Sequence, residues 1–262
     1  MAQDLEKRSG ALVAACARDL GTGKVEAHRD TDRLHAASLA KVALLLTLLG
    51  QAEEGAIRLD EPILVANQFR AVSGGTFQID RARDDDPEPW QRMGQHAPAA
   101  WLAQRMILRS SNLAANLLLE RVTAPEVTRL CRALGAGKMQ VVRCFEDEAA
   151  FAAGINNTTT AADLCALMSA IGEGSAPGSL AAVGLLERQE LPSGLRRGVP
   201  EGVRVASKTG SVTGHCHEAG LIFPEGRPPY VLAVMTRGFA DEPSAQAAIA
   251  ELSAAAWTAF TN

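Results

Sequence analysis

Ser38-Leu39-Ala40-Lys41-Val42-Ala43-Leu44-Leu45-Leu46-Thr47-Leu48-Leu49 (residues 38–49) is the most apolar stretch of this 262-residue chain. From Leu39 to Leu49 only Lys41 and Thr47 are polar, so a helix here is apolar on nearly every side. Such a helix belongs in the interior of a protein rather than on its surface. We therefore expect this helix to lie at the centre of the fold, with Lys41 buried.

Ser38 and Lys41 are three residues apart, so on a helix they project from the same face, one turn from each other. Serine is a weak nucleophile until a base takes its proton, and burial favours the neutral amine of a lysine, which is such a base. A helix start also stabilises a developing negative charge. The alternative is a helix-capping serine followed by an outward lysine, because an S-x-x-K pattern arises by chance in about one such chain in four.

The composition is that of a globular protein with a sizeable core. Hydrophobic residues make up 47% of the chain, and the formal net charge of −4 gives no reason to expect nucleic acid as a partner. No apolar run approaches the ~20 residues of a membrane span. Residues 1–10 lack the basic and then apolar pattern of a secretory signal. We expect a cytoplasmic protein acting on a small molecule, or a secreted one if the sequence is a trimmed mature form; the oligomeric state is not predicted.

Several residues of metal-binding type occur, but their spacing does not favour a metal. Consecutive Asp84, Asp85 and Asp86 seldom converge on one ion, so residues 81–98 are expected to form a solvated surface loop. The run His215-Cys216-His217 would alternate between the two faces of a strand. Five cysteines at irregular spacings suit reduced, mostly buried thiols. No metal and no cofactor is predicted.

Strand patterns lie at both ends of the chain. Residues 11–16 form an apolar strand, and residues 24–28 alternate as a returning strand after a turn. Near the other end, residues 203–208, 219–223 and 230–235 also have strand patterns. Strands at the two ends imply that the ends of the chain meet in one antiparallel sheet.

Helical periodicity fills most of the space between these strands. Beyond the central helix, it covers residues 99–109, 113–122, 125–134 and 161–171, and a closing helix follows at 241–260. The fold class is therefore α/β. We predict one lobe of sheet and flanking helices from residues 1–35 and 180–262, and an inserted helical lobe from residues 36–179. The catalytic cleft would lie between the two lobes.

Two further motifs decide the interpretation of the serine and lysine. Ser110-Ser111-Asn112 lies at the junction of two predicted helices, and Lys208-Thr209-Gly210-Ser211 lies at the end of a predicted strand. An accidental K-T-G is expected only about 0.02 times in a chain of this composition, so this motif is far more specific than S-x-x-K. In the order S-x-x-K, S-x-N and K-T-G, the three motifs resemble those of the penicillin-recognising serine enzymes, which are class A β-lactamases, DD-peptidases and their relatives.

The resemblance implies an acyl-enzyme mechanism. Ser38 matches the family nucleophile, and Lys41 matches the lysine that accepts its proton. Ser110 matches the hydroxyl that passes a proton to the leaving nitrogen, with Lys208 holding positive charge beside it. Asn112 matches the amide that orients the substrate and Lys41.

The resemblance also implies a binding surface along the K-T-G strand. The backbone N–H groups of Ser38 and Ser211 would form the oxyanion hole. Thr209 should contact the acidic group or carbonyl of the substrate, and Gly210 should leave space for the substrate to lie along the strand. For most of these positions taken singly, surface polarity is the simpler explanation.

The chain departs from the class A pattern in the loop that supplies the deacylating glutamate. Class A enzymes have Glu-Pro-x-x-Asn there, whereas here Glu146 is followed by Asp147, and Ala150 stands in place of the asparagine. Glu146 is the first candidate to activate water, with Glu148 as a weaker one. Exposure of Glu146 at the surface is the alternative.

The second departure concerns the arginine that commonly holds the carboxylate of a β-lactam. Counting along the hairpin from Lys208 brings Glu218 to the next-strand position. A carboxylate there would repel an anionic substrate, which would favour neutral or amine-bearing esters and amides. The alternative is that Glu218 points away from the cleft and pairs with an arginine.

Three functions are consistent with these observations. The first is β-lactamase-like hydrolysis of a β-lactam or related cyclic amide. The second is a cytoplasmic esterase, amidase or acyltransferase with the same catalytic residues, which the missing signal sequence would favour. The third is a protein that is acylated once and holds the ligand, which the altered glutamate loop would favour.

Overall fold

A five-stranded antiparallel sheet is built from the two ends of the chain, as predicted. The computed structural model describes residues 1–261, and its sheet has the order β2-β1-β11-β10-β9. Its strands are β1 (Leu12–Asp19), β2 (Val25–His28), β9 (Arg204–Val212), β10 (His215–Phe223) and β11 (Tyr230–Arg237). The central strand β11 is buried along residues 230–236, which explains its continuous apolar run.

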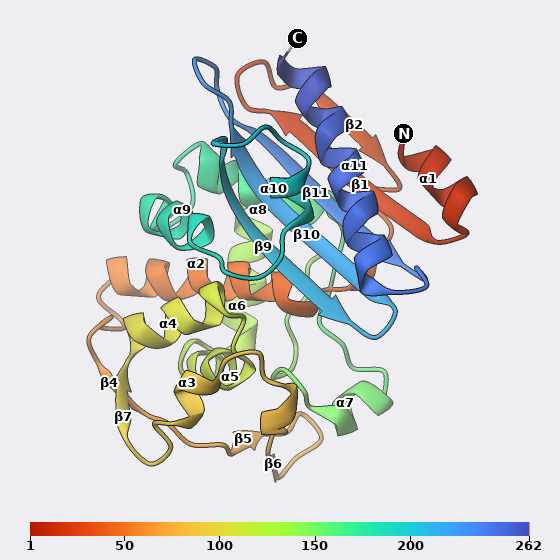
Figure 1. Cartoon of the computed structure of the whole chain (residues 1–262). Helices are drawn as coiled ribbons and strands as arrows, with labels where there is room; N and C mark the ends of the chain where they lie inside the picture. Colours follow the sequence, from red (N-terminus) through yellow and green to blue (C-terminus); the bar gives the residue numbers. More distant parts are fainter. Residues whose placement is uncertain (262) are drawn as a thin grey trace.

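Helices cover both faces of this sheet. Helices α1 (Ala2–Ser9) and α11 (Glu242–Thr261) lie on one face, and α8 (Ala161–Gly172) packs on the other against β1, β10 and β11 (Figure 1). Short α10 (Gly194–Arg197) lies beside α11, and α9 (Ser179–Glu187) contacts β9. The side chains of each strand alternate between these two faces, and this alternation decides which residues can reach the reaction centre.

The predicted central helix is α2 (Ala40–Glu53), and its residues 40–49 are all buried. A 3₁₀ turn, η1 (Ala37–Leu39), precedes it and carries Ser38. In Figure 1, α2 crosses below the sheet, with the other helices of this part of the chain beneath it. These are α3 (Pro87–Trp90), α4 (Ala99–Leu108), α5 (Asn112–Val122), α6 (Ala124–Ala133) and α7 (Glu148–Ala152).

Short elements tie the connecting segments together. Three two-stranded ladders pair β3 with β8, β4 with β7 and β5 with β6. Their bounds are β3 (Leu34–His35), β4 (Pro62–Leu64), β5 (Phe69–Arg70), β6 (Thr76–Phe77), β7 (His96–Pro98) and β8 (Thr158–Thr159), and a second 3₁₀ turn is η2 (Arg81–Arg83). The β3–β8 pair fixes the chain just before Ser38.

The acidic segment Asp84-Asp85-Asp86 corrects one expectation. Only Asp85 is exposed; Asp84 is half-buried, and Asp86 is completely buried. The carboxylate of Asp86 forms an ion pair with Arg105 of α4 at 2.6 and 2.7 Å. This stretch is therefore a packed segment that contacts two helices, and the prediction of a solvated loop was wrong for it.

The strand boundaries near the K-T-G motif also differ from the prediction. Lys208-Thr209-Gly210 lies in the middle of β9, not at its end, and β10 begins four residues earlier than predicted, at His215. The long β9–β10 hairpin carries Ser211 and His217 inside regular strands. The groups along this edge are therefore held by a continuous ladder of backbone hydrogen bonds.

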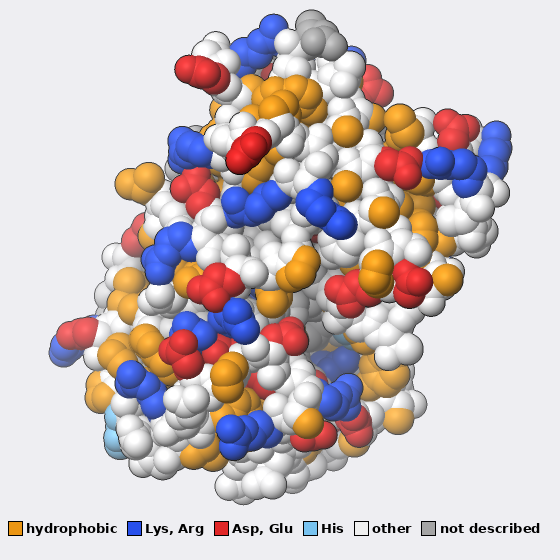
Figure 2. All heavy atoms as spheres, viewed as in Figure 1, with side chains coloured by type: hydrophobic (Ala, Val, Ile, Leu, Met, Phe, Trp, Pro, Cys, Tyr) orange, Lys and Arg blue, Asp and Glu red, His pale blue; other side chains and the backbone are white. Residues whose placement is uncertain are grey.

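The surface and the thiols agree with the composition. Basic and acidic side chains alternate over the face shown in Figure 2, without a large patch of one sign. All five cysteines are buried and free of disulfides. Within residues 1–261, no helix has the length and hydrophobicity needed to cross a membrane.

Candidate active site

Lys41 lies at the centre of a buried polar cluster. Its Nζ is 3.1 Å from Ser38 Oγ, 2.7 Å from Asn112 Oδ1 and 3.2 Å from Ser110 Oγ. It also donates to the backbone carbonyl of Ser110 at 2.6 Å. The structure thus brings together four of the predicted residues from two motifs about 70 positions apart.

Lys208 reaches the same hydroxyl from the sheet. Its Nζ lies 3.1 Å from Ser110 Oγ and 2.9 Å from the carbonyl of Thr209. Both lysine side chains are fully buried, and both contact the one oxygen of Ser110. Ser110 is therefore placed to exchange protons between the two amines.

Burial controls the charge of these amines. Desolvation lowers the pKa of Lys41 to about 8, against the opposing charges of Asp84, Asp85 and Glu146. Desolvation and the charge of Lys41 lower the pKa of Lys208 well below its ordinary value. Burying two neighbouring ammonium groups away from water costs free energy. One of the two lysines therefore gives up its proton readily. A neutral amine 3.1 Å from a serine hydroxyl is a competent general base.

The nucleophile turn lies against the K-T-G strand at very close range. A Cβ on Gly210 would come within 2.9 Å of the backbone nitrogen of Ser38, so only glycine fits there. Strand N–H groups alternate in direction, and that of Thr209 points to the open edge of β9, where the side chain of Gln189 binds it. The N–H of Ser211, two residues further on, therefore points to the same edge, and the turn that carries Ser38 packs against β9 at Gly210. This is the arrangement expected of an oxyanion hole.

Glu146 also reaches the cluster, and Glu148 does not. One carboxylate oxygen of Glu146 accepts a hydrogen bond from Asn112 Nδ2, and the other is buried without a partner among residues 1–261. Desolvation raises the pKa of Glu146, although the bond from Asn112 opposes this. A raised pKa makes the carboxylate a stronger base. Glu148 is exposed and pairs with Arg83 at the surface.

Two asparagines hold the segment that ends in Glu146. Asn116, buried in α5, accepts from the N–H of Phe145 at 2.7 Å and donates to its carbonyl at 2.9 Å. Asn157 makes three similar bonds to residues 142 and 143. The roles of these asparagines were not predicted. For Asn116 a signal was present, because it lies one helical turn after Asn112 and therefore on the same face.

Backbone strain is concentrated at this site. Within residues 1–261, five non-glycine residues have positive φ, and three of them are Ala37, Ser110 and Glu146, at 46°, 58° and 61°. Such conformations cost of order 1–3 kcal/mol each and persist where the surrounding structure imposes them. Here they occur just before the nucleophile, at the shared hydroxyl and at the candidate base. Strain at all three points indicates a site shaped for chemistry.

Comparison with known proteins agrees with this geometry. A family model described as the beta-lactamase enzyme family matches residues 2–260. The chain belongs to this family. It is 28% identical to a beta-lactamase of Streptomyces lavendulae, over 88% of this chain and 76% of that protein. It is 26% identical to the carbapenem-hydrolyzing beta-lactamase KPC of Klebsiella oxytoca, over 89% and 78%. The crystal structure of a beta-lactamase from Sphaerobacter thermophilus superposes with a TM-score of 0.86 at 26% identity, covering 99% and 94%.

This member of the β-lactamase family does not use Glu218 as predicted. The side chain is completely buried, and its oxygens accept hydrogen bonds from Ser193 Oγ, Ser207 Oγ and the N–H of Leu195. Glu218 lies on the sheet face covered by α10 and α11, opposite the face from which Lys208 reaches Ser110. The expectation that Glu218 faces the substrate was therefore wrong. The alternative was right that Glu218 points away from the cleft, but within residues 1–261 its carboxylate is bound by Ser193, Ser207 and Leu195 and not by an arginine.

Thr209 shares that face and is also engaged. Its hydroxyl and its N–H both donate to Gln189 Oε1, each at 2.8 Å. A contact between this hydroxyl and a substrate, as predicted, would require the bond to Gln189 to be exchanged. Gln189 was not singled out in the sequence, because nothing in its neighbourhood marks it. Only the resemblance to class A enzymes assigns a substrate-binding role to the hydroxyl of Thr209. This role therefore stays a prediction.

The histidines near the nucleophile form hydrogen bonds to the backbone. His217 Nδ1 accepts from the N–H of Thr236, and its Nε2 lies 3.0 Å from the carbonyl of His35. Burial lowers the pKa of His217 to about 3, which keeps the ring neutral. Cys216 points to the other face of the sheet, into the core beneath α11. Within residues 1–261, no group of three metal-ligating side chains is suited to a metal ion.

Proposed function

We propose that this protein hydrolyses β-lactams through a covalent acyl-enzyme on Ser38. The observation that carries the proposal is the position of Lys41 Nζ, which is within 3.2 Å of Ser38 Oγ, Ser110 Oγ and Asn112 Oδ1 in a buried cluster. A base in contact with both the nucleophile and a proton-relay hydroxyl can serve both halves of an acyl transfer. Membership of the β-lactamase family supports the choice of a cyclic amide as substrate.

Acylation follows from the contacts. Ser38 Oγ attacks the ring carbonyl carbon while its proton passes to Lys41 Nζ. The N–H groups of Ser38 and Ser211 stabilise the carbonyl oxygen as it becomes negative. The proton then moves through Ser110 Oγ to the ring nitrogen as the C–N bond breaks, and Lys208 keeps positive charge beside Ser110. The product is an ester of Ser38.

Deacylation falls to Glu146. Its carboxylate takes a proton from a water molecule, the resulting hydroxide attacks the ester carbon, and Ser38 Oγ leaves and recovers a proton. Asn112 contacts both Lys41 Nζ and Glu146, so it links the groups that serve the two half-reactions. The oxygen of Glu146 that has no partner within residues 1–261 is the acceptor available to that water.

Nitrocefin turnover tests the proposal. The purified chain should open nitrocefin with steady turnover, and intact-mass and peptide mapping of a quenched sample should place the acyl group on Ser38. Ser38→Ala should abolish both signals. A covalent adduct that survives Ser38→Ala would refute the assignment of the nucleophile. No reaction of the parent with any β-lactam would refute the proposed substrate class.

One observation favours a second function, in which the protein is acylated and holds the ligand. Ala150 replaces the asparagine of the class A loop, and its methyl group lies buried in α7, where it offers no hydrogen bond to a water molecule or to Glu146. A stoichiometric burst of nitrocefin opening without further turnover would support this second function over the first. Steady turnover would exclude it.

A further inference from the structure

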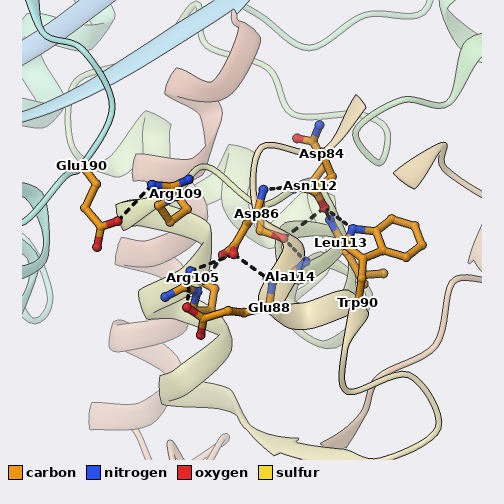
Figure 3. A network of polar contacts seen from close by, with 11 residues as sticks. Asp84, Asp86, Glu88, Trp90, Arg105, Arg109, Asn112, Leu113, Ala114 and Glu190 are labelled. Carbon is orange, nitrogen blue, oxygen red and sulfur yellow. Dashed lines mark hydrogen bonds and ion pairs between the residues drawn. The ribbon is translucent and has the colours of Figure 1, made fainter. Parts of the chain in front are cut away.

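The carboxylate of Asp84 lies inside the turn that carries Ser110 and Asn112. Its Oδ2 accepts hydrogen bonds from the N–H of Leu113 at 2.9 Å and from Ser111 Oγ at 3.1 Å. Its Oδ1 accepts from the N–H of Asn112 at 3.1 Å. The N–H groups at a helix start have no partner within the helix, and here a side chain from 28 residues upstream supplies two of them with an acceptor (Figure 3).

Asp84 is itself held from several directions. Trp90 Nε1 donates to Oδ2 at 3.0 Å, and the N–H of Asp86 lies 3.3 Å from Oδ1. Asp86 anchors the segment by its bidentate ion pair with Arg105 of α4, and it also caps α3 by accepting from the N–H of Glu88. Figure 3 shows these groups converging from the acidic segment and from α3, α4 and α5. The acceptor is therefore rigidly placed.

The turn that Asp84 binds is strained and carries reactive groups. Ser110 has φ 58° and its hydroxyl contacts both lysines, while Asn112 contacts Lys41 and Glu146. The middle residue, Ser111, already uses its hydroxyl oxygen to accept from the N–H of Ala114. Class A enzymes have S-D-N at these positions, with a carboxylate in the middle. Ser111 is without one, and Asp84 brings a carboxylate to the same turn.

We propose that Asp84 is a positioning residue for the reaction, holding Ser110 and Asn112 in register with Lys41 from outside the motif. The inference rests on the proposed function of the site for its kinetic consequence. It concerns the geometry of the turn, so it is also open to a measurement without substrate. Without the carboxylate, the N–H groups of Asn112 and Leu113 lose their acceptor, and the strained turn at Ser110 loses its support.

The test compares two neighbouring substitutions that remove the same charge. Asp84→Asn is isosteric but presents an amide N–H₂ to donors. Asp85→Asn is the matched control, because Asp85 is exposed and its side chain makes no hydrogen bond or ion pair within residues 1–261. A third variant, Asp84→Asn with Ser111→Asp, returns a carboxylate to the turn at the middle position. Nitrocefin kinetics and hydrogen exchange of the Asn112 and Leu113 amides are measured for each.

We expect Asp84→Asn to lower kcat by about tenfold to a hundredfold, which is the range for lost hydrogen bonds to a charged group. The two amides bind different oxygens of Asp84, and asparagine keeps one acceptor oxygen, so exchange of at least one of the two amides should accelerate by about tenfold or more. Asp85→Asn should leave the exchange of both amides within about twofold of the parental rate. Its effect on kcat should be well below that of Asp84→Asn, because it removes only a charge that raises the pKa of Lys41. The double variant should recover a substantial part of kcat.

Equal effects of Asp84→Asn and Asp85→Asn would show that only charge matters, and would overturn the inference. Unchanged exchange of both amides in Asp84→Asn would overturn it as well. If the parent itself opens no β-lactam, the proposed function fails, and the exchange measurement alone decides the role of Asp84. If Asp84→Asn does not fold, the double variant decides: a folded and active protein supports the inference, and a folded but slow one contradicts it.

Discussion

The groups that would form the acyl-enzyme and the group that would break it are held in different ways. Ser38, Lys41 and Lys208 lie on a 3₁₀ turn, a buried helix and a central stretch of strand, which backbone hydrogen bonds fix. Glu146 lies in an irregular segment with positive φ, which side chains such as Asn116 hold in place. The acylating region therefore depends on the fold itself, whereas the deacylating region depends on a few side-chain contacts.

This difference predicts that evolution and mutation can alter the two half-reactions separately. The acylating motifs S-x-x-K, S-x-N and K-T-G are all present, while the glutamate loop departs from the class A pattern at two positions. A substitution in the glutamate loop should leave the structures of α2 and β9 unchanged, because neither element includes residues of that loop. The following predictions test how far this separation extends.

The largest effect is expected for Lys41→Ala, which should abolish acylation. Loss of a general base typically costs 10²–10⁴-fold in rate, or roughly 3–5 kcal/mol of barrier. The fold should remain largely intact, because alanine is tolerated in a buried helix. The rate of the nitrocefin burst is the measurement, with circular dichroism as the check on folding. An unchanged acylation rate would assign the base role to another group, with Lys208 as the next candidate.

Glu146→Gln should separate the two half-reactions. At a pH well above 8, where Lys41 is neutral in both proteins, the variant should acylate at the parental rate but accumulate the covalent species. Its turnover should be lower by about 10²–10³-fold because the base for water is lost. Intact-mass measurement during turnover detects the ester. Glu148→Gln is the matched control, since Glu148 is exposed and pairs with Arg83; it should turn over like the parent. Parental turnover in Glu146→Gln would leave Lys41 and Ser110 as the groups acting on water.

The support of the glutamate segment gives the next prediction. Asn116→Ala leaves the buried N–H and carbonyl of Phe145 without partners, so stability should fall by about 2 kcal/mol and deacylation should slow by about tenfold. Asn67→Ala is the control, because Asn67 makes the same pair of bonds to Ile79. It should lower stability without changing deacylation. A burst rate reduced as much as the deacylation rate in Asn116→Ala would show that the two regions are coupled.

Much of the fold follows from the sequence, because its signals are periodic and local. The helix at residues 38–49 and the strand at 230–235 are continuous apolar runs, and both are found as predicted. The site residues of the three motifs could also be named, because each motif has a fixed spacing. Their assembly around Lys41 is a geometric finding, while their catalytic roles stay predictions until the variants are measured.

The failures concern contacts between distant segments. Asp84 and Asp86 were predicted to be solvated. Their partners, Asn112 and Arg105, lie about 20–28 positions away in the sequence, and no sequence pattern indicates these contacts. Glu218 was placed by counting along a hairpin, but the count did not include which face of the sheet the residue occupies. One residue of register changes the face, so Glu218 lies under α10 rather than in the cleft.

The pH dependence of acylation should follow Lys41. Because its neutral amine is the base and its pKa is about 8, the burst rate should rise with pH and reach half its maximum near pH 8. The charge of Glu146 is one of those that raise this pKa, so Glu146→Gln should move the midpoint to lower pH. Glu148→Gln should leave it in place. A midpoint in Glu146→Gln at or above the parental value would contradict the assignment of Lys41.

The smallest effect concerns which substrates the acylating strand accepts. With Glu218 buried, the carboxylate next to the K-T-G strand is Glu242 at the start of α11, whose Oε1 accepts from Ser211 Oγ at 2.9 Å. Ser211, Asp241 and Glu242 line one cavity of about 360 Å³ beyond the predicted oxyanion hole. An anionic substituent extending along β9 would therefore meet a like charge, which salt and solvent weaken but do not remove.

We expect Glu242→Gln to raise kcat/KM for a substrate with a free carboxylate by roughly two- to fivefold, relative to the same substrate with that carboxylate esterified. Asp241→Asn is the matched control. Asp241 is the adjacent residue, lines the same cavity and carries the same charge, but its carboxylate accepts from the N–H of Ser244 instead of contacting Ser211. If both variants change the substrate preference equally, the effect comes from the overall negative electrostatic potential at the cavity and not from the contact between Glu242 and Ser211. If neither variant changes the preference, the substituent does not extend past Ser211. The groups that select the substrate then lie along the stretch of β9 from Thr209, which Gln189 binds, to Ser211.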